Sequence, residues 1–270
     1  RESFPQQLGF DVGKPWASIG KANNKGYEVS VNYTQPINRD LTIETRGSFT
    51  LTKNKLTYAD EPAYPLEWQR MTGKPLGYTR GLIAERLFID EEDIKNSPDQ
   101  SQFGSTVLPG DIKYKDLNND GKIDNNDRTM ISPYGSTPKI QYGFGVTAFW
   151  KKFDLGVFFQ GSAQRTIMIS GLHPFGTGER NVFKFIADDY CTEDNPNPHA
   201  KYPRLDIKDS NNNTQASTFW KRSGSFIRLK NAEIGYKLPF GRVYVNGTNL
   251  LTFSSFDLWD PELSWNTYPL

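Results

Sequence analysis

Strict alternation of apolar and polar residues is the feature that most constrains the fold of this chain. It runs through residues 27–34, 41–51, 140–150 and 153–160 and returns within 226–251. Because successive side chains of a β-strand point to opposite faces, a period of two predicts strands with one apolar and one polar face. The residues expected on the apolar face include Tyr27, Val29, Val31, Tyr33, Ile43, Phe49, Tyr142, Phe144, Val157, Val243 and Val245.

The alternating stretches are predicted to form three hairpins. Short turns at 36–40, 151–152 and 239–241 contain the Pro, Asn, Asp, Lys and Gly residues expected between paired strands. In the last hairpin the apolar positions change phase, which indicates a bulge near Asn231. Helical signals are few, and residues 90–94 predict one short helix with an acidic first turn. The chain is therefore expected to be nearly all β.

The connections between these strands differ strongly in length. The turns are short, whereas 58–138 and 171–225 are long, polar and rich in Pro, Gly and Asn. Compact soluble domains rarely carry such loops, but outer-membrane barrels combine short periplasmic turns with long extracellular loops. We therefore expect 58–138 to be one extracellular excursion, including any small hairpin within 77–88.

Composition excludes two classes of protein. The 270 residues contain 32 Lys+Arg against 31 Asp+Glu, a net charge of +1, so a nucleic-acid binder held by a broad basic field is not expected. No apolar run reaches 18 residues, which excludes a transmembrane helix but not transmembrane strands.

Aromatic residues make up 14% and gather near the turns, as in an interfacial girdle. A soluble β-sandwich, whose strands also alternate, is the alternative.

An acidic loop at 116–127 has the spacing of a 12-residue calcium-binding loop. Gly121 occupies the sixth position, where the sharp turn requires glycine, and Ile123 at the eighth is expected to anchor the loop inward. The predicted Ca²⁺ ligands are Asp116, Asn118, Asp120, the Lys122 carbonyl, Asp124 and Asp127. The twelfth ligand is the shorter Asp in place of Glu. A structural calcium ion is expected, and a solvated turn rich in Asn and Asp is the alternative.

Enzymatic motifs are lacking in the sequence. It contains neither Gly-x-Ser-x-Gly nor His-Glu-x-x-His. His173, Cys191 and His199 share one long loop with Asp188 and Asp189, a spacing too unspecific to define a metal or Cys–His site. Paired carboxylates of the glycosidase kind stay open as an alternative. We expect no enzymatic activity.

Several stretches, in order along the chain, resemble the SusC/RagA-type TonB-dependent outer-membrane transporters of Bacteroidetes. They are 20–28 (GKANNKGYE), 109–121 (PGDIKYKDLNNDG), 226–236 (FIRLKNAEIGY), 242–250 (RVYVNGTNL) and 260–262 (DPE). The resemblance implies that residues 1–270 are the C-terminal part of a large antiparallel transmembrane β-barrel, 22-stranded in the family. It also implies that the signal peptide, the TonB-contacting segment and the plug domain lie upstream, outside this chain, and that a last strand follows it.

The same resemblance implies a function and partners. The function is import of a glycan or peptide across the outer membrane of a Gram-negative cell by a multi-pass barrel embedded in outer-membrane lipid. The implied partners are a SusD-like surface lipoprotein that lids the barrel and TonB, which acts through the upstream part. Aromatic residues of the loops are candidates to stack on substrate, or they pack within their own loops: Tyr58, Tyr64, Trp68, Tyr78 and Trp220. The alternative from another class is a soluble calcium-stabilised β-sandwich binding module.

Overall fold

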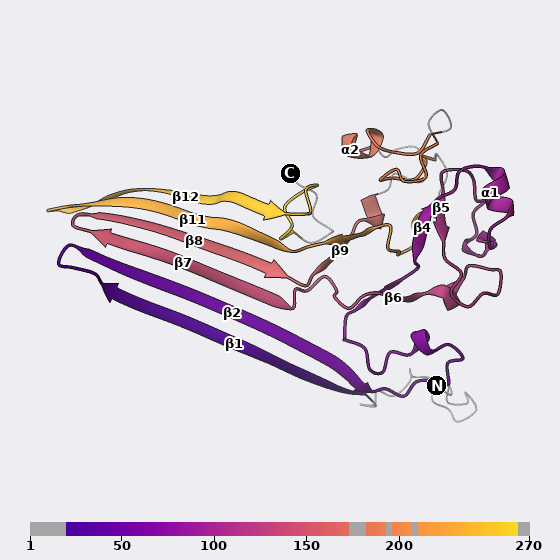
Figure 1. Ribbon diagram of the computed structural model, residues 1–270, viewed down its shortest axis with the longest axis horizontal. Helices are drawn as coiled ribbons and strands as arrows, with labels where there is room; N and C mark the ends of the chain where they lie inside the picture. The colour runs from indigo at the N-terminus through magenta and orange to yellow at the C-terminus, as the bar shows by residue number, and fades with distance from the viewer. Residues whose placement is uncertain (1–19, 173–181, 193–195, 207–209, 264–270) are drawn as a thin grey trace, which may run out of the picture.

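The computed structural model describes residues 20–172, 182–192, 196–206 and 210–263. Six long strands form one antiparallel sheet in the order β1-β2-β7-β8-β11-β12, and the long connections gather at one end of it (Figure 1). The strands are β1 (Lys21–Pro36), β2 (Leu41–Tyr58), β7 (Ile140–Trp150), β8 (Phe153–Ala163), β11 (Phe226–Leu238) and β12 (Gly241–Ser254). The three predicted hairpins are confirmed. So is the bulge, because the register of β11 shifts between Leu229 and Asn231 against both of its neighbours.

The register gathers all the residues predicted for the apolar face onto one side of this sheet. Directly paired residues share a face, and one row of pairs crosses all six strands: Val31, Gly47, Phe144, Phe159, Leu229 and Leu251. We call this side the apolar face and the opposite side the polar face. Many side chains of the apolar face are exposed, such as Val31 at 55% and Val245 at 71%. No second sheet covers this face within the described residues, which disagrees with the β-sandwich alternative.

The hydrophobic core cluster lies at the loop end of the molecule rather than on the sheet. The described residues of 59–139, 164–225 and 255–263 fold together into what we call the loop body, most of which lies at the right of Figure 1. Its core consists of Leu82, Leu87, Ile112, Tyr114, Ile123, Ile167, Ile169, Ile186, Cys191, Ala200, Tyr202, Trp220 and Phe256. The two long connections and the segment after β12 all contribute to it. They therefore stabilise one another by burying shared apolar surface.

Short elements build the loop body. Its strands are β3 (Thr79–Gly81), β4 (Ala84–Leu87), β5 (Ile112–Tyr114), β6 (Thr129–Ser132), β9 (Thr166–Met168) and β10 (Lys221–Ser223). Its helical turns are η2 (Glu67–Gln69), α1 (Glu91–Lys95), η3 (Ser101–Phe103), η4 (Asn125–Asp127), η5 (Ser170–Leu172) and α2 (Lys184–Ala187). No hairpin forms within 77–88, because β3 pairs with β6 and β4 with β5, each across the excursion.

The predicted short helix is confirmed as α1. Asp90 is its N-cap, and its side chain accepts a hydrogen bond of 2.7 Å from the backbone N–H of Asp93. The Asp93 carboxylate in turn binds Arg86 and Lys113, and the bonds from Arg86 hold its pKa well below the usual range. Among the described helices, none is long and apolar enough to cross a membrane.

Candidate functional site

A hollow of about 590 Å³ lies where the polar face meets the loop body, and we call it the junction hollow. The sheet side is formed by polar-face residues, among them Thr50 of β2, Gln141 of β7 and Gln160 of β8. The segment 136–138 of the loop body forms another wall. A second hollow of about 440 Å³ adjoins it, since both are lined by Ser136 and Arg165.

The aromatic ring of Phe158 is part of the lining of the junction hollow. Phe158 points to the polar face, and its ring lies across the backbone of Gly143 and Gly145 on the neighbouring strand. A Cβ atom at either glycine would come within 2.8 Å of that ring, so a larger residue there would displace it. The guanidinium of Arg46 sits 4.5 Å from the ring centroid, a cation–π contact that fixes the ring from the side of β2.

Two arginines attach the segment after β12 to the edge of this hollow. Arg228 of β11 is only 3% exposed and forms ion pairs with Asp260 and with Glu262, the latter at 2.9 Å. Arg165 donates hydrogen bonds to the backbone carbonyls of Ser136, Pro261 and Leu263. The motif at 260–262 thus closes the hollow at the loop end of the sheet.

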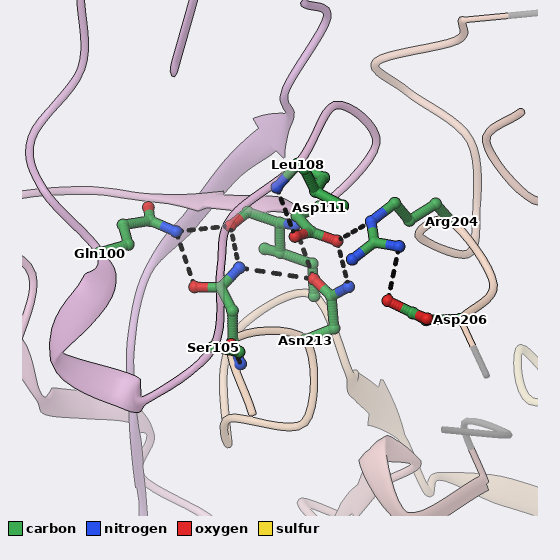
Figure 2. Close-up of polar contacts among 9 residues, drawn as sticks. Gln100, Ser105, Leu108, Asp111, Arg204, Asp206 and Asn213 are labelled. Atoms are coloured by element: carbon green, nitrogen blue, oxygen red, sulfur yellow. Dashed lines mark hydrogen bonds and ion pairs between the residues drawn. The ribbon is translucent and has the colours of Figure 1, made fainter. Parts of the chain in front are cut away.

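A buried polar cluster joins the two long connections of the loop body (Figure 2). Asp111 is 0% exposed, and its carboxylate accepts hydrogen bonds from Leu108 N at 2.9 Å and from the Asn213 side-chain amide at 2.7 Å. Arg204 Nε lies 2.7 Å from Asp111 Oδ1, and the same guanidinium also binds Asp206. Burial raises the pKa of the Asp111 carboxyl, while the bonds from Leu108, Arg204 and Asn213 oppose that shift. The cluster therefore holds the excursion at 58–138 against the second long connection at 171–225.

The predicted calcium loop is ordered by its own backbone. Asp116 accepts hydrogen bonds from the N–H groups of Asn119 and Gly121 at 2.7 and 2.8 Å, and buried Asp127 accepts from those of Leu117 and Asp124 at 2.8 Å. Gly121 has a φ of +81°, a conformation that favours glycine, and its neighbour Ile123 is fully buried as expected.

The calcium site itself stays a prediction. The predicted ligands would all bind the ion through oxygen atoms, which a hard cation prefers. They are Asp116, Asn118, Asp120, the carbonyl of Lys122, Asp124 and Asp127. Their carboxylates are bound to backbone amides instead of converging, and the described residues hold no group of three or more His, Cys, Asp or Glu side chains placed to bind a metal ion.

The calcium-type loop contacts one of the aromatic candidates for substrate binding. Trp68 Nε1 donates a hydrogen bond of 2.7 Å to the backbone carbonyl of Asn126. The side-chain amide of Gln69 donates one of 2.9 Å to the side-chain oxygen of Asn126. These two hydrogen bonds join the calcium-type loop to η2.

The other aromatic candidates lie in different surroundings. Tyr58 is 52% exposed at the end of β2, Tyr64 is half-buried, and half-buried Tyr78 lies 5.4 Å from Lys74 Nζ. For the candidate Trp220 the structure agrees with the alternative of packing within the loops, because its side chain is 0% exposed and its Nε1 donates to the carbonyl of Asn213 at 2.7 Å. Trp220 is a core residue of the loop body.

The Cys–His alternative gains no support. His173 lies outside the described residues, and His199 is exposed. Cys191 is buried against Gly110, and burial raises the pKa of its thiol, which leaves less of the reactive thiolate near neutral pH.

Sequence reasoning missed the junction hollow. Its residues are spread over β2, β7, β8 and two loops, and no short motif joins them. The only sequence signal was that Gln141 and Gln160 fall on the polar positions of two alternating stretches, together with Ser and Thr.

The sheet and its two faces define a class of protein. An open antiparallel sheet with an uncovered apolar face, a polar opposite face, short turns at one end and large loops at the other is the arrangement of an outer-membrane barrel wall. In the described part of the chain β1 and β12 are the outer strands of this sheet, and their edges leave room for further strands.

Comparison with known proteins agrees with this class. No family model matches the chain. It is 29% identical over 291 residues to TonB-dependent receptor P3 of Formosa agariphila and 28% identical over 280 residues to TonB-dependent receptor P26 of the same organism. These alignments cover 97% and 96% of this chain and 27% of each relative. Among solved structures, the RagAB peptide importer in its open-open state matches with a TM-score of 0.66 and 21% identity, covering 96% of this chain and 28% of that one.

These matches confirm the resemblance to TonB-dependent receptors. The sequence resembles TonB-dependent receptors over nearly its whole length, and the all-β antiparallel fold is that of part of the RagAB importer. The chain spans about a quarter of the length of the curated relatives it matches.

Proposed function

We propose that this chain is part of the wall and external loops of an outer-membrane transporter that imports a glycan or peptide. The observation that carries this proposal is the single apolar face, continuous over six strands and uncovered within the described residues. Such a face is unfavourable in water and favourable against lipid. The similarity to TonB-dependent receptors over 97% of the chain supports the same function.

In this proposal the chain contributes enclosure and recognition, with no chemical step. The polar face lines the barrel interior, and the loop body lies on the extracellular side. A SusD-like surface lipoprotein would contact the loop body, and TonB would act through the upstream part of the protein. The similarity to TonB-dependent receptors and the fold shared with the RagAB importer support these partners.

Fractionation and uptake measurements on the whole transporter test the proposal. We expect the protein in the outer-membrane fraction, resistant to extraction by high salt, and we expect uptake of its substrate to require both this protein and TonB. Loss of TonB should abolish uptake while leaving the protein in the membrane. Recovery of the whole protein in a soluble fraction would favour the soluble calcium-stabilised binding module.

We also propose that the loop at 116–127 binds a structural calcium ion. Its support is the 12-residue spacing of oxygen donors, with glycine at the sixth position and a buried anchor at Ile123. Ion binding would require the carboxylates of Asp116 and Asp120 to exchange backbone amides for the cation.

Calcium removal gives the test of this second proposal. A chelator should raise the protease sensitivity of 109–133 in the whole transporter, because four carboxylates without the ion repel one another. Asp120→Ala should do the same in the presence of calcium, and Asp60→Ala, an acidic residue outside the loop, is the matched control. Equal protease sensitivity with and without calcium would show that the segment is only a turn rich in Asn and Asp.

A further inference from the structure

Three lysines lie together at the loop end of the apolar face, and we call them the lysine patch: Lys25 of β1 and Lys53 and Lys55 of β2. Lys25 pairs directly with Lys53, and Lys55 pairs with Asn23, so all three share the face of Tyr27. All three lysines are exposed. We propose that the lysine patch binds the phosphate groups of the glycolipid in the outer leaflet of the outer membrane. This inference rests on the proposed transport function, which places the loop end outside the cell.

The charge of the lysine patch is not neutralised within the described part of the chain. Like charges directly opposite each other on neighbouring strands repel and destabilise the pair. None of the three lysines forms an ion pair with a described residue, and the face of β1 and β2 that carries them contains no Asp or Glu. The acidic residues of these strands, Glu28 and Glu44, alternate with Tyr27 and Ile43 and therefore belong to the polar face. An anion that is not part of these two strands would stabilise the patch.

The lysine patch lies at the depth of the lipid headgroups. β2 pairs with β7 from Leu41 to Leu51, and roughly 9–11 residues are enough for a strand to cross a membrane. Lys53 is the next residue after Leu51 on the same face, about 7 Å farther along the strand. Tyr27, which pairs with Leu51, is 75% exposed, and such a tyrosine is typical of the membrane–water interface. The ammonium groups of Lys25 and Lys53 would therefore lie just outside the apolar layer.

A lipid phosphate suits this position better than a soluble anion does. The lysine patch continues directly into exposed apolar side chains of β1, among them Val29 at 53%. Lysine ammonium groups bind phosphate as point charges, and their long aliphatic stems reach along an apolar surface toward the headgroups. A phosphorylated glycolipid presents an anion at the membrane surface and acyl chains beside the apolar face, so it matches both parts. A soluble anion would match only the charge.

Lipid binding to the purified whole transporter in detergent tests this inference, with bound lipid counted by native mass spectrometry. The probes are lipid A carrying its phosphates and the same lipid A with its phosphates removed. We expect the phosphorylated form to bind more tightly. Lys25→Gln and Lys53→Gln should each weaken its binding about 5-fold, the usual attraction of one basic side chain near an anionic lipid surface, and the double variant about 10- to 30-fold. Binding of the dephosphorylated form should not change between the variants.

Lys151→Gln combined with Lys152→Gln is the matched control. These two exposed lysines form the turn between β7 and β8, at the other end of the same sheet. We expect this double variant to bind phosphorylated lipid A as the unmodified transporter does.

Three results would overturn the inference. They are equal binding of the two lipid forms, failure of phosphorylated lipid A to bind, and a loss of binding in the Lys151 and Lys152 control as large as in the Lys25 and Lys53 double variant. In each case the protein would still be recovered from the outer membrane and would still import its substrate. The transport proposal would then survive while the lipid site failed.

Discussion

Val31→Arg is expected to destabilise the assembled transporter by about 2–4 kcal/mol, the depth-dependent cost of an arginine on the lipid face of a barrel. Val31 lies in the central part of the 16-residue β1, pairs with Gly47 and has its side chain 55% exposed on the apolar face. In lipid the new guanidinium would lose its hydration, and the apolar face offers it no counter-charge. Urea titration of the whole transporter folded into lipid bilayers measures this loss.

Ser30→Arg is the matched control for that substitution. Ser30 is the preceding residue of the same strand and pairs with Ser48 on the polar face. There the guanidinium would stay hydrated, so we expect a change below about 1 kcal/mol, as for most surface substitutions. An equal loss of stability from both variants would show that the two faces do not differ in environment, and would contradict the assignment of the apolar face to lipid.

The long strands could be predicted from the sequence because each carries its own signal. Along a strand of this length, every second side chain meets the same environment. The faces, the three hairpins and the bulge near Asn231 therefore follow from the local pattern of apolar and polar residues. The short helix at 90–94 was equally local, since it begins with the N-cap Asp90.

The loop body could not be predicted in the same way. Its strands have three or four residues, too few to display a period, and their partners lie far along the chain. The Asn213–Asp111 hydrogen bond joins residues 102 positions apart, and no local pattern reports such a contact. Trp220 illustrates the consequence: an aromatic residue in a polar stretch is compatible with exposure or burial, and only the fold shows that it is buried.

The cluster around Asp111 gives the second large expected effect. Arg204→Ala removes the cation that lies 2.7 Å from a carboxylate with 0% exposure, and breaking a buried pair in this way costs about 3–5 kcal/mol. We expect that loss in the local free energy of unfolding of the loop body, measured by hydrogen exchange in the whole transporter. The sheet should keep its protection, because the cluster joins loop segments only.

Two controls and one pH measurement distinguish a buried pair from an ordinary surface contact. Lys201→Ala removes an exposed cation that lies 3.6 Å from Asp189, and we expect a loss of about 1 kcal/mol or less. Asp111→Asn combined with Arg204→Ala should recover much of the lost stability, because no buried charge is then left unpaired.

In Arg204→Ala alone the pKa of Asp111 should rise further above its unfolded value near 3.9. The folded state then binds the proton more tightly than the unfolded state, so the destabilisation should be largest at neutral pH and should shrink as the pH falls through the raised pKa. A loss of stability in Arg204→Ala that is equally large on both sides of that pKa would mean that Arg204 acts through packing rather than through its charge.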